Sequence, residues 1–244
     1  MKRYDAIVIG GGPAGATAAL LLARAGWSIA VVERSPYPRG KVCGEYIAPP
    51  ALALLHDMGV GHIVDEAGPE VRRIAVWNHG TRVTAVMPAY GDERARYGRA
   101  LSREACDARL LQHAVEAGAE LWQPYRAIEL RGKAGAFECD VERAGAVATL
   151  HARCIIAAHG SWEAGRLPTQ VKRASAKPDD LFGFKAYFSH VALARDLLPL
   201  MSFAGGYAGM VNTSGGRVNL SCCVRRDALE RVRALYPGRP AGDA

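Results

Sequence analysis

The chain has 244 residues, of which half are hydrophobic and 23% are charged, and its formal net charge is +7. This balance is typical of a globular protein and excludes a disordered, collagen-like or coiled-coil chain. No apolar run reaches the roughly 18 residues that a membrane span needs, so no transmembrane helix is predicted. Because the arginines are spread along the chain, an anionic cofactor or substrate explains the charge as well as nucleic acid does, and we expect no nucleic-acid partner.

The N-terminus and the cysteines both favour a cytoplasmic protein. Residues 1–8 place charged side chains before a short strand-like run and lack the longer apolar region and cleavage site of a signal peptide. The six cysteines are scattered without a CxxC pair or the Cys/His spacing of a metal site. We therefore expect reduced thiols, no metal and a cytoplasmic chain that starts at Met1.

The first 35 residues predict one βαβ unit. A buried parallel strand is expected at residues 4–9, a helix at 13–25 and a second strand at 28–33. A loop rich in proline, glycine and arginine follows at 35–48, and loops of this length are often functional. A short helix then begins at Pro49 and is expected to stop at Gly59.

Beyond residue 70 the pattern changes to runs that are typical of strands. The runs at 71–77 and 81–87, joined by Asn-His-Gly, predict an antiparallel hairpin. A helix is expected from Ser102 to Gly118. Further strands, interrupted by glycines, predict a small meander that returns to the parallel sheet and then a second, mostly antiparallel layer. Their expected ranges are 125–130, 136–141, 146–150, 154–158 and 181–224.

The run Gly10-Gly11-Gly12-Pro13-Ala14-Gly15 satisfies the pattern GxGxxG between a predicted strand and a predicted helix. Gly10 permits the tight turn, Gly12 lets the backbone approach a pyrophosphate, and Gly15 allows close packing of helix on strand. The helix N-terminus then faces the phosphates. Glu33, at the end of the second strand, can accept hydrogen bonds from an adenosine ribose. The motif predicts FAD or NAD, and its place at the start of the chain favours FAD.

Three more segments carry a family resemblance: Lys41-Val42-Cys43-Gly44-Glu45, Leu101-Ser102-Arg103 to Leu110, and Cys154 to Gly160. With the N-terminal unit they resemble the FAD-dependent oxidoreductases of the geranylgeranyl reductase and p-hydroxybenzoate hydroxylase superfamily over nearly the whole chain. The Cys-Gly-Glu loop is more similar to the geranylgeranyl reductase relatives than to the aromatic hydroxylases.

The resemblance implies an α/β fold with a Rossmann-type FAD-binding domain (GR2-like) and an inserted, mostly antiparallel β substrate domain. We expect the FAD-binding domain at residues 1–68 and 99–168, and segments of an incomplete substrate domain at 69–98 and 169–244. Members of the family are normally longer and carry a further Gly-Asp motif after the substrate domain. On this basis the sequence resembles the front two-thirds of such an enzyme and is expected to lack its C-terminal third.

The resemblance also implies which residues contact the cofactor. Arg103 would reach FAD from the side, the backbone at Ala127 would meet the adenine, and the loop 39–45 would bring Cys43 near the flavin. Cys43 is therefore the candidate catalytic residue, although a loop thiol without chemistry is an equal alternative, and Arg103 could be a surface side chain. The expected cofactor-binding residues are Gly10, Gly12, Pro13, Ala14, Gly15, Glu33, Arg34, Lys41, Cys43, Gly44, Arg103, Ala127, His159 and Gly160.

One departure from the family pattern concerns the electron donor. His159-Gly160 stands where the family usually has Asp-Gly. A strand-end histidine held by a backbone carbonyl is favoured over a catalytic base at His159. The substitution leaves the donor open between NAD(P)H and a reduced electron carrier, which could be a protein partner.

The predicted function is an FAD-dependent oxidoreductase or monooxygenase that reduces or hydroxylates an apolar or aromatic small molecule. The alternative is a non-catalytic or vestigial flavin-binding fragment of a longer enzyme. An NAD-dependent dehydrogenase is disfavoured, because a plain doubly wound fold would continue its alternation of strand and helix after residue 35.

Overall fold

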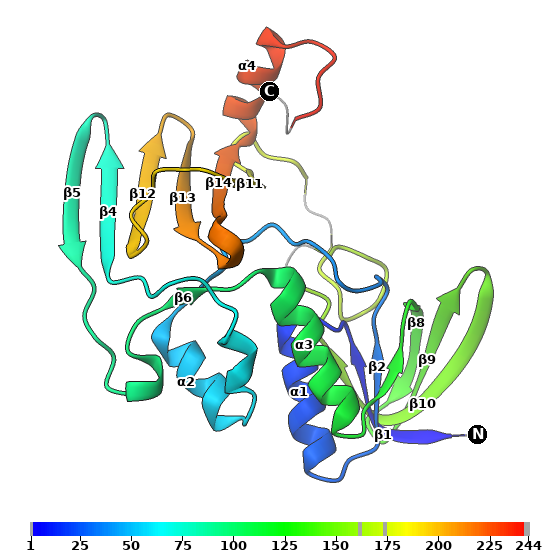
Figure 1. Ribbon diagram of the computed structural model, residues 1–244. Coiled ribbons are helices and arrows are strands. Elements are labelled where there is room, and N and C mark those ends of the chain that lie inside the picture. Colours follow the sequence, from blue (N-terminus) through cyan, green and yellow to red (C-terminus); the bar gives the residue numbers. More distant parts are fainter. Residues whose placement is uncertain (1, 161–162, 173–174, 242–244) are drawn as a thin grey trace. The chain divides into compact units, whose positions relative to one another are not determined.

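The computed structural model describes residues 2–160, 163–172 and 175–241 (Figure 1). Its internal contacts divide the chain into two compact units, Met1–Arg39 with Glu104–Ala174 and Gly40–Arg103 with Ser175–Ala244. This division groups residues 40–68 with the second unit, whereas we expected them in the FAD-binding domain from the sequence. Compactness and cofactor binding are different criteria, so the domain assignment stays a prediction.

The first unit is built on a six-stranded sheet in the order β7-β2-β1-β10-β9-β8. Its strands are β1 (Arg3–Ile9), β2 (Ile29–Val32), β7 (Glu120–Trp122), β8 (Arg126–Lys133), β9 (Ala136–Arg143) and β10 (Ala146–Ala157). Its helices are α1 (Pro13–Arg24) and α3 (Arg103–Glu116). The predicted βαβ start is therefore present, with β7 added as a further parallel neighbour of β2.

Helix α1 forms where the sequence indicates it. Pro13 occupies the first turn, where its missing N–H costs nothing. The buried residues Gly15, Ala16, Ala19 and Leu20 lie on one face at helical spacing. Gly26, just past the end, has a φ of 84°, a conformation that favours glycine.

Strand β10 corrects the predicted split between residues 146–150 and 154–158. It is one strand of 12 residues. Residues 146–152 pair antiparallel with β9, and residues 151–157 pair parallel with β1. No glycine or proline interrupts the run from Ala146 to Ala157, so the meander passes into the parallel sheet without a turn.

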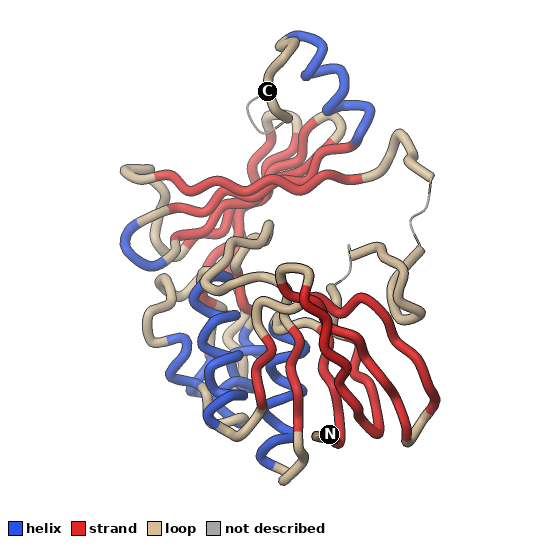
Figure 2. The backbone as a smooth tube through the Cα atoms, turned by 90° about the vertical axis from the view of Figure 1, so that its right-hand side faces the viewer, coloured by secondary structure: helices blue, strands red, loops and turns tan. Residues whose placement is uncertain are grey.

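The meander folds over the parallel strands and shares a core with them. Figure 2 shows helices beside the strands of this unit. A buried hydrophobic cluster joins side chains of β1 and β2 to side chains of β9 and β10 and to Leu167, which follows β10 in the chain. Its strand members are Tyr4, Ile7, Ile9, Ala30, Val32, Cys139, Val141, Leu150 and Ala152. This packing fixes the carboxyl ends of β1 and β2, where the glycine motif begins.

The second unit contains a sheet in the order β11-β14-β13-β12-β4-β5. Its strands are β4 (Arg73–Asn78), β5 (Thr81–Val86), β11 (Leu181–Phe188), β12 (Leu197–Phe203), β13 (Gly206–Asn212) and β14 (Val218–Arg225). The β12–β4 pair is parallel and the other neighbours are antiparallel, which confirms the mostly antiparallel layer. The β4–β5 hairpin turns at His79 and Gly80, both with positive φ.

Several small elements of the second unit escaped the sequence analysis, although α2 (Pro49–Asp57) was expected. The strands β3 (Tyr46–Ile47) and β6 (Arg99–Ala100) pair over two residues each, which is too short for periodicity to be visible. The helix α4 (Arg226–Leu235) follows β14 directly. Three short 3-10 helices complete the unit: η1 (Gly61–Val64), η2 (Glu93–Ala95) and η3 (Ser214–Gly216). Within the described ranges, the helices are too short or too polar to cross a membrane.

Candidate functional site

The glycine turn between β1 and α1 leaves no room for side chains at two of its positions. Gly10 has a φ of 109°, and a Cβ there would lie 2.2 Å from the carbonyl oxygen of Ala158. A Cβ on Gly15 would lie 1.8 Å from the carbonyl oxygen of Gly10. Both glycines are therefore required by the approach of β1, α1 and the end of β10.

Gly12 is different, because its missing side chain would point into open space. A Cβ on Gly12 would meet no atom within 4 Å. Gly12 caps α1 without a side-chain hydrogen bond, and Pro13 and Ala14 begin the first turn. The N–H groups of a first helical turn have no acceptor inside the helix and attract an anion. These residues thus fit a pyrophosphate such as that of FAD, which could approach the backbone at Gly12.

The carboxylate of Glu33 is fastened to the glycine turn. Glu33 is 3% exposed. It accepts hydrogen bonds from the N–H of Gly11 at 2.8 Å and from the N–H of Ser35 at 2.8 Å, and it faces the guanidinium of Arg39 at 3.4 Å. Glu33 thereby holds the turn, and its expected contact with a ribose stays a prediction. The neighbouring Arg34 forms an ion pair with Glu163 at 2.8 Å.

Sequence reasoning missed a tyrosine and an arginine that close over this turn. The hydroxyl of Tyr37 donates to the carbonyl of Gly11 at 2.9 Å, and burial raises the pKa of Tyr37 to about 12, so it stays a neutral donor. The guanidinium of Arg39 lies 5.0 Å from the Tyr37 ring centre. Within the described part of the chain, Nε of Arg39 is buried without a hydrogen-bond partner. The pattern Tyr-x-Arg in a long loop after the strand was the available signal.

His159 and Gly160 follow β10, and the structure corrects the expected partner of the histidine. Nε2 of His159 lies 2.8 Å from the hydroxyl of Thr169, so a side chain and not a backbone carbonyl holds the ring. Burial lowers the pKa of His159. Gly160 has a φ of 93°. Ala127 lies in β8 opposite Val141, beside a bulge, and its expected contact with adenine stays a prediction.

In the second unit, the Cys-Gly-Glu segment lies against the face of the sheet formed by β11 and β14. A Cβ on Gly183 would lie 2.9 Å from Cγ1 of Val42, and a Cβ on Gly44 would lie 3.3 Å from the hydroxyl of Ser221. The segment 42–45 therefore passes closely over two neighbouring strands. Lys41, which precedes it, is half-buried.

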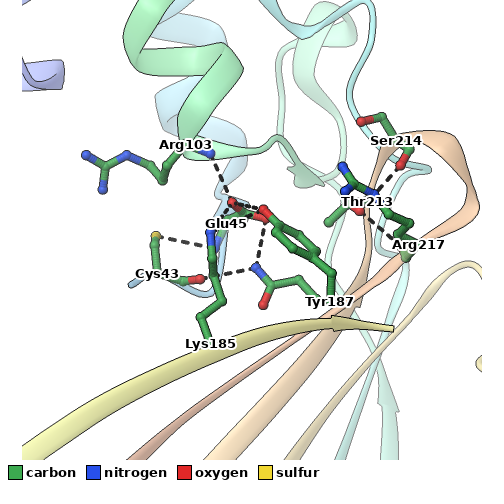
Figure 3. Close-up of polar contacts among 9 residues, drawn as sticks. Cys43, Glu45, Arg103, Lys185, Tyr187, Thr213, Ser214 and Arg217 are labelled. Carbon is green, nitrogen blue, oxygen red and sulfur yellow. Dashed lines mark hydrogen bonds and ion pairs between the residues drawn. The ribbon is translucent and has the colours of Figure 1, made fainter. Parts of the chain in front are cut away.

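Glu45 ends this segment with its carboxylate buried and surrounded by donors (Figure 3). Oε1 accepts hydrogen bonds from the hydroxyl of Tyr187 at 2.6 Å, from the ammonium of Lys185 at 3.0 Å and from the N–H of Arg103 at 3.0 Å. Oε2 accepts from the amide of Asn219 at 2.8 Å. Figure 3 shows the guanidinium of Arg103 extending away, so its backbone N–H makes this contact.

The charges of this network are mutually stabilised. Burial favours the neutral form of Glu45, but hydrogen bonds from Tyr187, Arg103, Lys185 and Asn219 outweigh it and lower the pKa of the carboxyl. Burial opposes the charge of Lys185, yet its bond to Glu45 raises the pKa of the ammonium. Burial and the carboxylate together raise the pKa of Tyr187. The result is a buried ion pair with a neutral tyrosine donor.

Cys43 is connected to the same network through its thiol and its backbone carbonyl. Its Sγ accepts the N–H of Glu45 at 3.3 Å, and its carbonyl accepts Nδ2 of Asn219 at 3.1 Å. Oδ1 of Asn219 is buried without a hydrogen-bond partner in the described structure. Sequence reasoning missed Lys185 and Asn219, although alternation on β11 places Lys185 and Tyr187 on one face.

The predicted site residues thus fall into two groups. The first unit assembles the glycine turn and Glu33, and the second assembles Cys43, Gly44 and the backbone of Arg103. Within the described residues, His, Cys, Asp and Glu side chains form no group that could hold a metal ion. The cysteines are free thiols.

Comparisons with known proteins identify a matching family and a similar relative. A family profile described as "FAD binding domain" matches residues 3–186. A menaquinone reductase of Mycobacterium tuberculosis is 35% identical over 118 residues, which cover 48% of this chain and 28% of that protein.

Two solved structures share the fold. A myxobacterial chondrochloren halogenase, a variant of the FAD-dependent halogenases, superimposes with a TM-score of 0.80 at 22% identity, over 98% of this chain and 56% of that one. A geranylgeranyl bacteriochlorophyll reductase-like protein from Thermoplasma acidophilum gives 0.74 at 20% identity, over 98% and 63%. The chain therefore spans less than two-thirds of the length of these relatives.

Proposed function

The chain belongs to the FAD binding domain family. We propose that it acts as a flavin-dependent oxidoreductase that reduces or hydroxylates an apolar or aromatic small molecule. The observation that carries this proposal is the turn at residues 10–15. Gly10 and Gly15 have no room for a Cβ, whereas Gly12 faces open space at the start of a helix. That combination is suited to a bound pyrophosphate.

Reduction is the preferred reaction. Its support is the Cys-Gly-Glu segment, which resembles the geranylgeranyl reductase relatives, together with the menaquinone reductase at 35% identity. Bound flavin would supply hydride transfer, and the protein would supply placement and electrostatics. The electrons would come from NAD(P)H or from a reduced carrier.

The residues of the chain take distinct roles in this proposal. The first-turn N–H groups after Gly12 hold the pyrophosphate, and Glu33 orders the turn and faces the ribose. Tyr37 fixes the carbonyl of Gly11. Cys43 is the candidate group that gives or takes a proton at Sγ during reduction of the substrate.

Flavin binding is tested by the absorbance spectrum of the purified chain after FAD is added and the excess removed. The wild-type protein is expected to keep its flavin, and Gly12→Val is expected to lose it. The matched control is Gly91→Val, because a Cβ on Gly91 also meets nothing within 4 Å and its φ is unstrained. A Gly12→Val protein that is folded and still binds FAD would overturn the proposed site.

The reaction is tested on the flavin-loaded protein. The flavin is reduced without oxygen, and its reoxidation is followed after adding a quinone, an apolar alkene or an aromatic substrate with oxygen. A rate that depends on a quinone or alkene, and falls in Cys43→Ala, supports reduction. A rate that depends on an aromatic substrate and oxygen supports hydroxylation. A rate that no substrate changes supports the non-catalytic alternative.

A further inference from the structure

The carboxylate of Glu45 and the thiol of Cys43 belong to one hydrogen-bonded arrangement on the second sheet. We propose that Glu45 is the positioning residue that holds the segment 42–45 on this sheet and thereby sets the place of the Cys43 thiol. The functional meaning of that placement rests on the proposed function, in which Cys43 handles a proton. The placement itself rests on the contacts of Glu45.

The backbone at Glu45 needs support from its surroundings. Its φ is 62°, in the left-handed region that side-chain-bearing residues rarely adopt. Such a conformation persists only where neighbouring contacts determine it. The buried carboxylate of Glu45 supplies those contacts. A buried charge is tolerated only when it is paired and hydrogen-bonded, so the donors around the carboxylate hold the residue in place. The hydrogen bonds to the charged carboxylate of Glu45 thus offset the unfavourable conformation of its backbone.

One donor to Glu45 also binds Cys43, and Glu45 itself contacts the Cys43 thiol. Nδ2 of Asn219 donates both to Oε2 of Glu45 and to the carbonyl of Cys43, so one amide joins the two residues. The N–H of Glu45 donates to Sγ of Cys43. A shift of the Glu45 backbone therefore moves the donor that the thiol contacts, while Asn219 holds the carbonyl of the same cysteine.

The supporting side chains come from adjacent strands and meet at this one segment. Tyr187 lies opposite Asn219 in the register of β11 and β14, and Lys185 lies on the same face of β11 as Tyr187. The side chain of Lys185 is 10% exposed and that of Glu45 is fully buried. Two strands that are far apart in the sequence thus place an ammonium group, a phenol and an amide around one carboxylate. This arrangement positions a loop and is not a surface ion pair.

The experiment compares Glu45→Gln with Glu93→Gln, a control whose side chain is 83% exposed. Hydrogen exchange of peptides covering residues 41–47 and alkylation of Cys43, both resolved by mass spectrometry, are measured without FAD. Glu45→Gln is expected to raise both rates about tenfold, because charged hydrogen bonds that hold the segment are lost. Cys139, which is fully buried in the first unit, reports global opening and should stay protected.

Two further variants separate positioning from stability. Tyr187→Phe removes one donor to Glu45 and serves if Glu45→Gln fails to fold. The double variant Glu45→Gln with Lys185→Met removes both charges, so it should be more stable than the Lys185→Met variant. Hydrogen exchange of residues 41–47 should stay faster in it than in the wild type. Unchanged exchange and alkylation in folded Glu45→Gln or Tyr187→Phe would overturn this inference. Failure of the wild-type chain to bind FAD would overturn the proposed function alone, because these rates are read without flavin.

Discussion

Tyr187 and Asn219 face each other across β11 and β14, and both donate hydrogen bonds to the carboxylate of Glu45. A cross-strand pair thus holds a residue that lies far away in the sequence. The register of the sheet determines this site, because a slip of one residue would turn either side chain to the opposite face. The position of the Cys43 thiol therefore depends on that register.

Lys185→Met is expected to lower the free energy of unfolding by about 3–5 kcal/mol, because it leaves the buried Glu45 carboxylate without its cation. Urea unfolding measures the change. Glu45→Gln in the Lys185→Met background should recover part of the loss, since the uncompensated charge is then removed. If the two single changes simply added in the double variant, the ion pair would not be coupled as the 3.0 Å contact indicates.

Acid should weaken the protein through Glu45. Hydrogen bonds to its carboxylate overcome the effect of burial and hold its pKa below the usual 4.5. A lowered carboxyl pKa gives stability that is complete above the unfolded value and is lost as pH falls through the folded one. The unfolding free energy of the wild type should therefore fall more steeply below pH 4.5 than that of Glu45→Gln.

Urea midpoints at a series of pH values measure this difference, with Glu93→Gln as the control. Glu93→Gln makes the same chemical change on a side chain that is 83% exposed. Equal slopes for the wild type and Glu45→Gln would show that the carboxyl of Glu45 titrates alike in the folded and unfolded chain.

The FAD-binding fold was predictable because its signal is local. The glycines, the helix and Glu33 fall within 35 residues, and each has a stated physical reason in the turn. The family match over residues 3–186 confirms the resemblance stated from the sequence. The mostly antiparallel second layer was predictable for a similar reason, since strand alternation and glycine turns are short-range patterns.

The Glu45 network was not predictable, because its members are joined by strand register. Glu45 was visible as part of the Cys-Gly-Glu loop, but Lys185 and Asn219 lie in strands whose pairing no local pattern specifies. The partner of His159 was missed because Thr169 lies in a segment after β10 that carries no regular pattern of strand or helix. The split of β10 was wrong because one strand pairs with different neighbours along its length.

Two glycines of the same motif should lose different amounts of stability when they are replaced by alanine. Gly15→Ala is expected to lower the free energy of unfolding by about 3 kcal/mol, because its Cβ would lie 1.8 Å from the carbonyl of Gly10. Gly12→Ala should cost less than about 1 kcal/mol, since its Cβ meets open space at a helix cap. Thermal unfolding without FAD measures both. A Gly15→Ala protein as stable as the wild type would contradict the close approach of helix and strand.

Glu33→Gln tests whether the carboxylate orders the glycine turn. Its two oxygens accept hydrogen bonds from the backbone N–H groups of Gly11 and Ser35. In glutamine one of these oxygens becomes an NH₂ group, which would face a backbone N–H and could not accept its hydrogen bond. The expected loss is about 1.5–3 kcal/mol in urea unfolding, whereas Glu93→Gln should change stability by less than about 0.5 kcal/mol.

A titration with FAD, made where both proteins are folded, completes the test of Glu33. Weaker binding by Glu33→Gln is expected, because a turn that has lost its anchor presents its N–H groups less uniformly to the pyrophosphate. Flavin affinity equal to that of the wild type, in a variant that is measurably less stable, would assign Glu33 to the fold alone. Lower affinity at unchanged stability would instead favour the direct contact with the ribose.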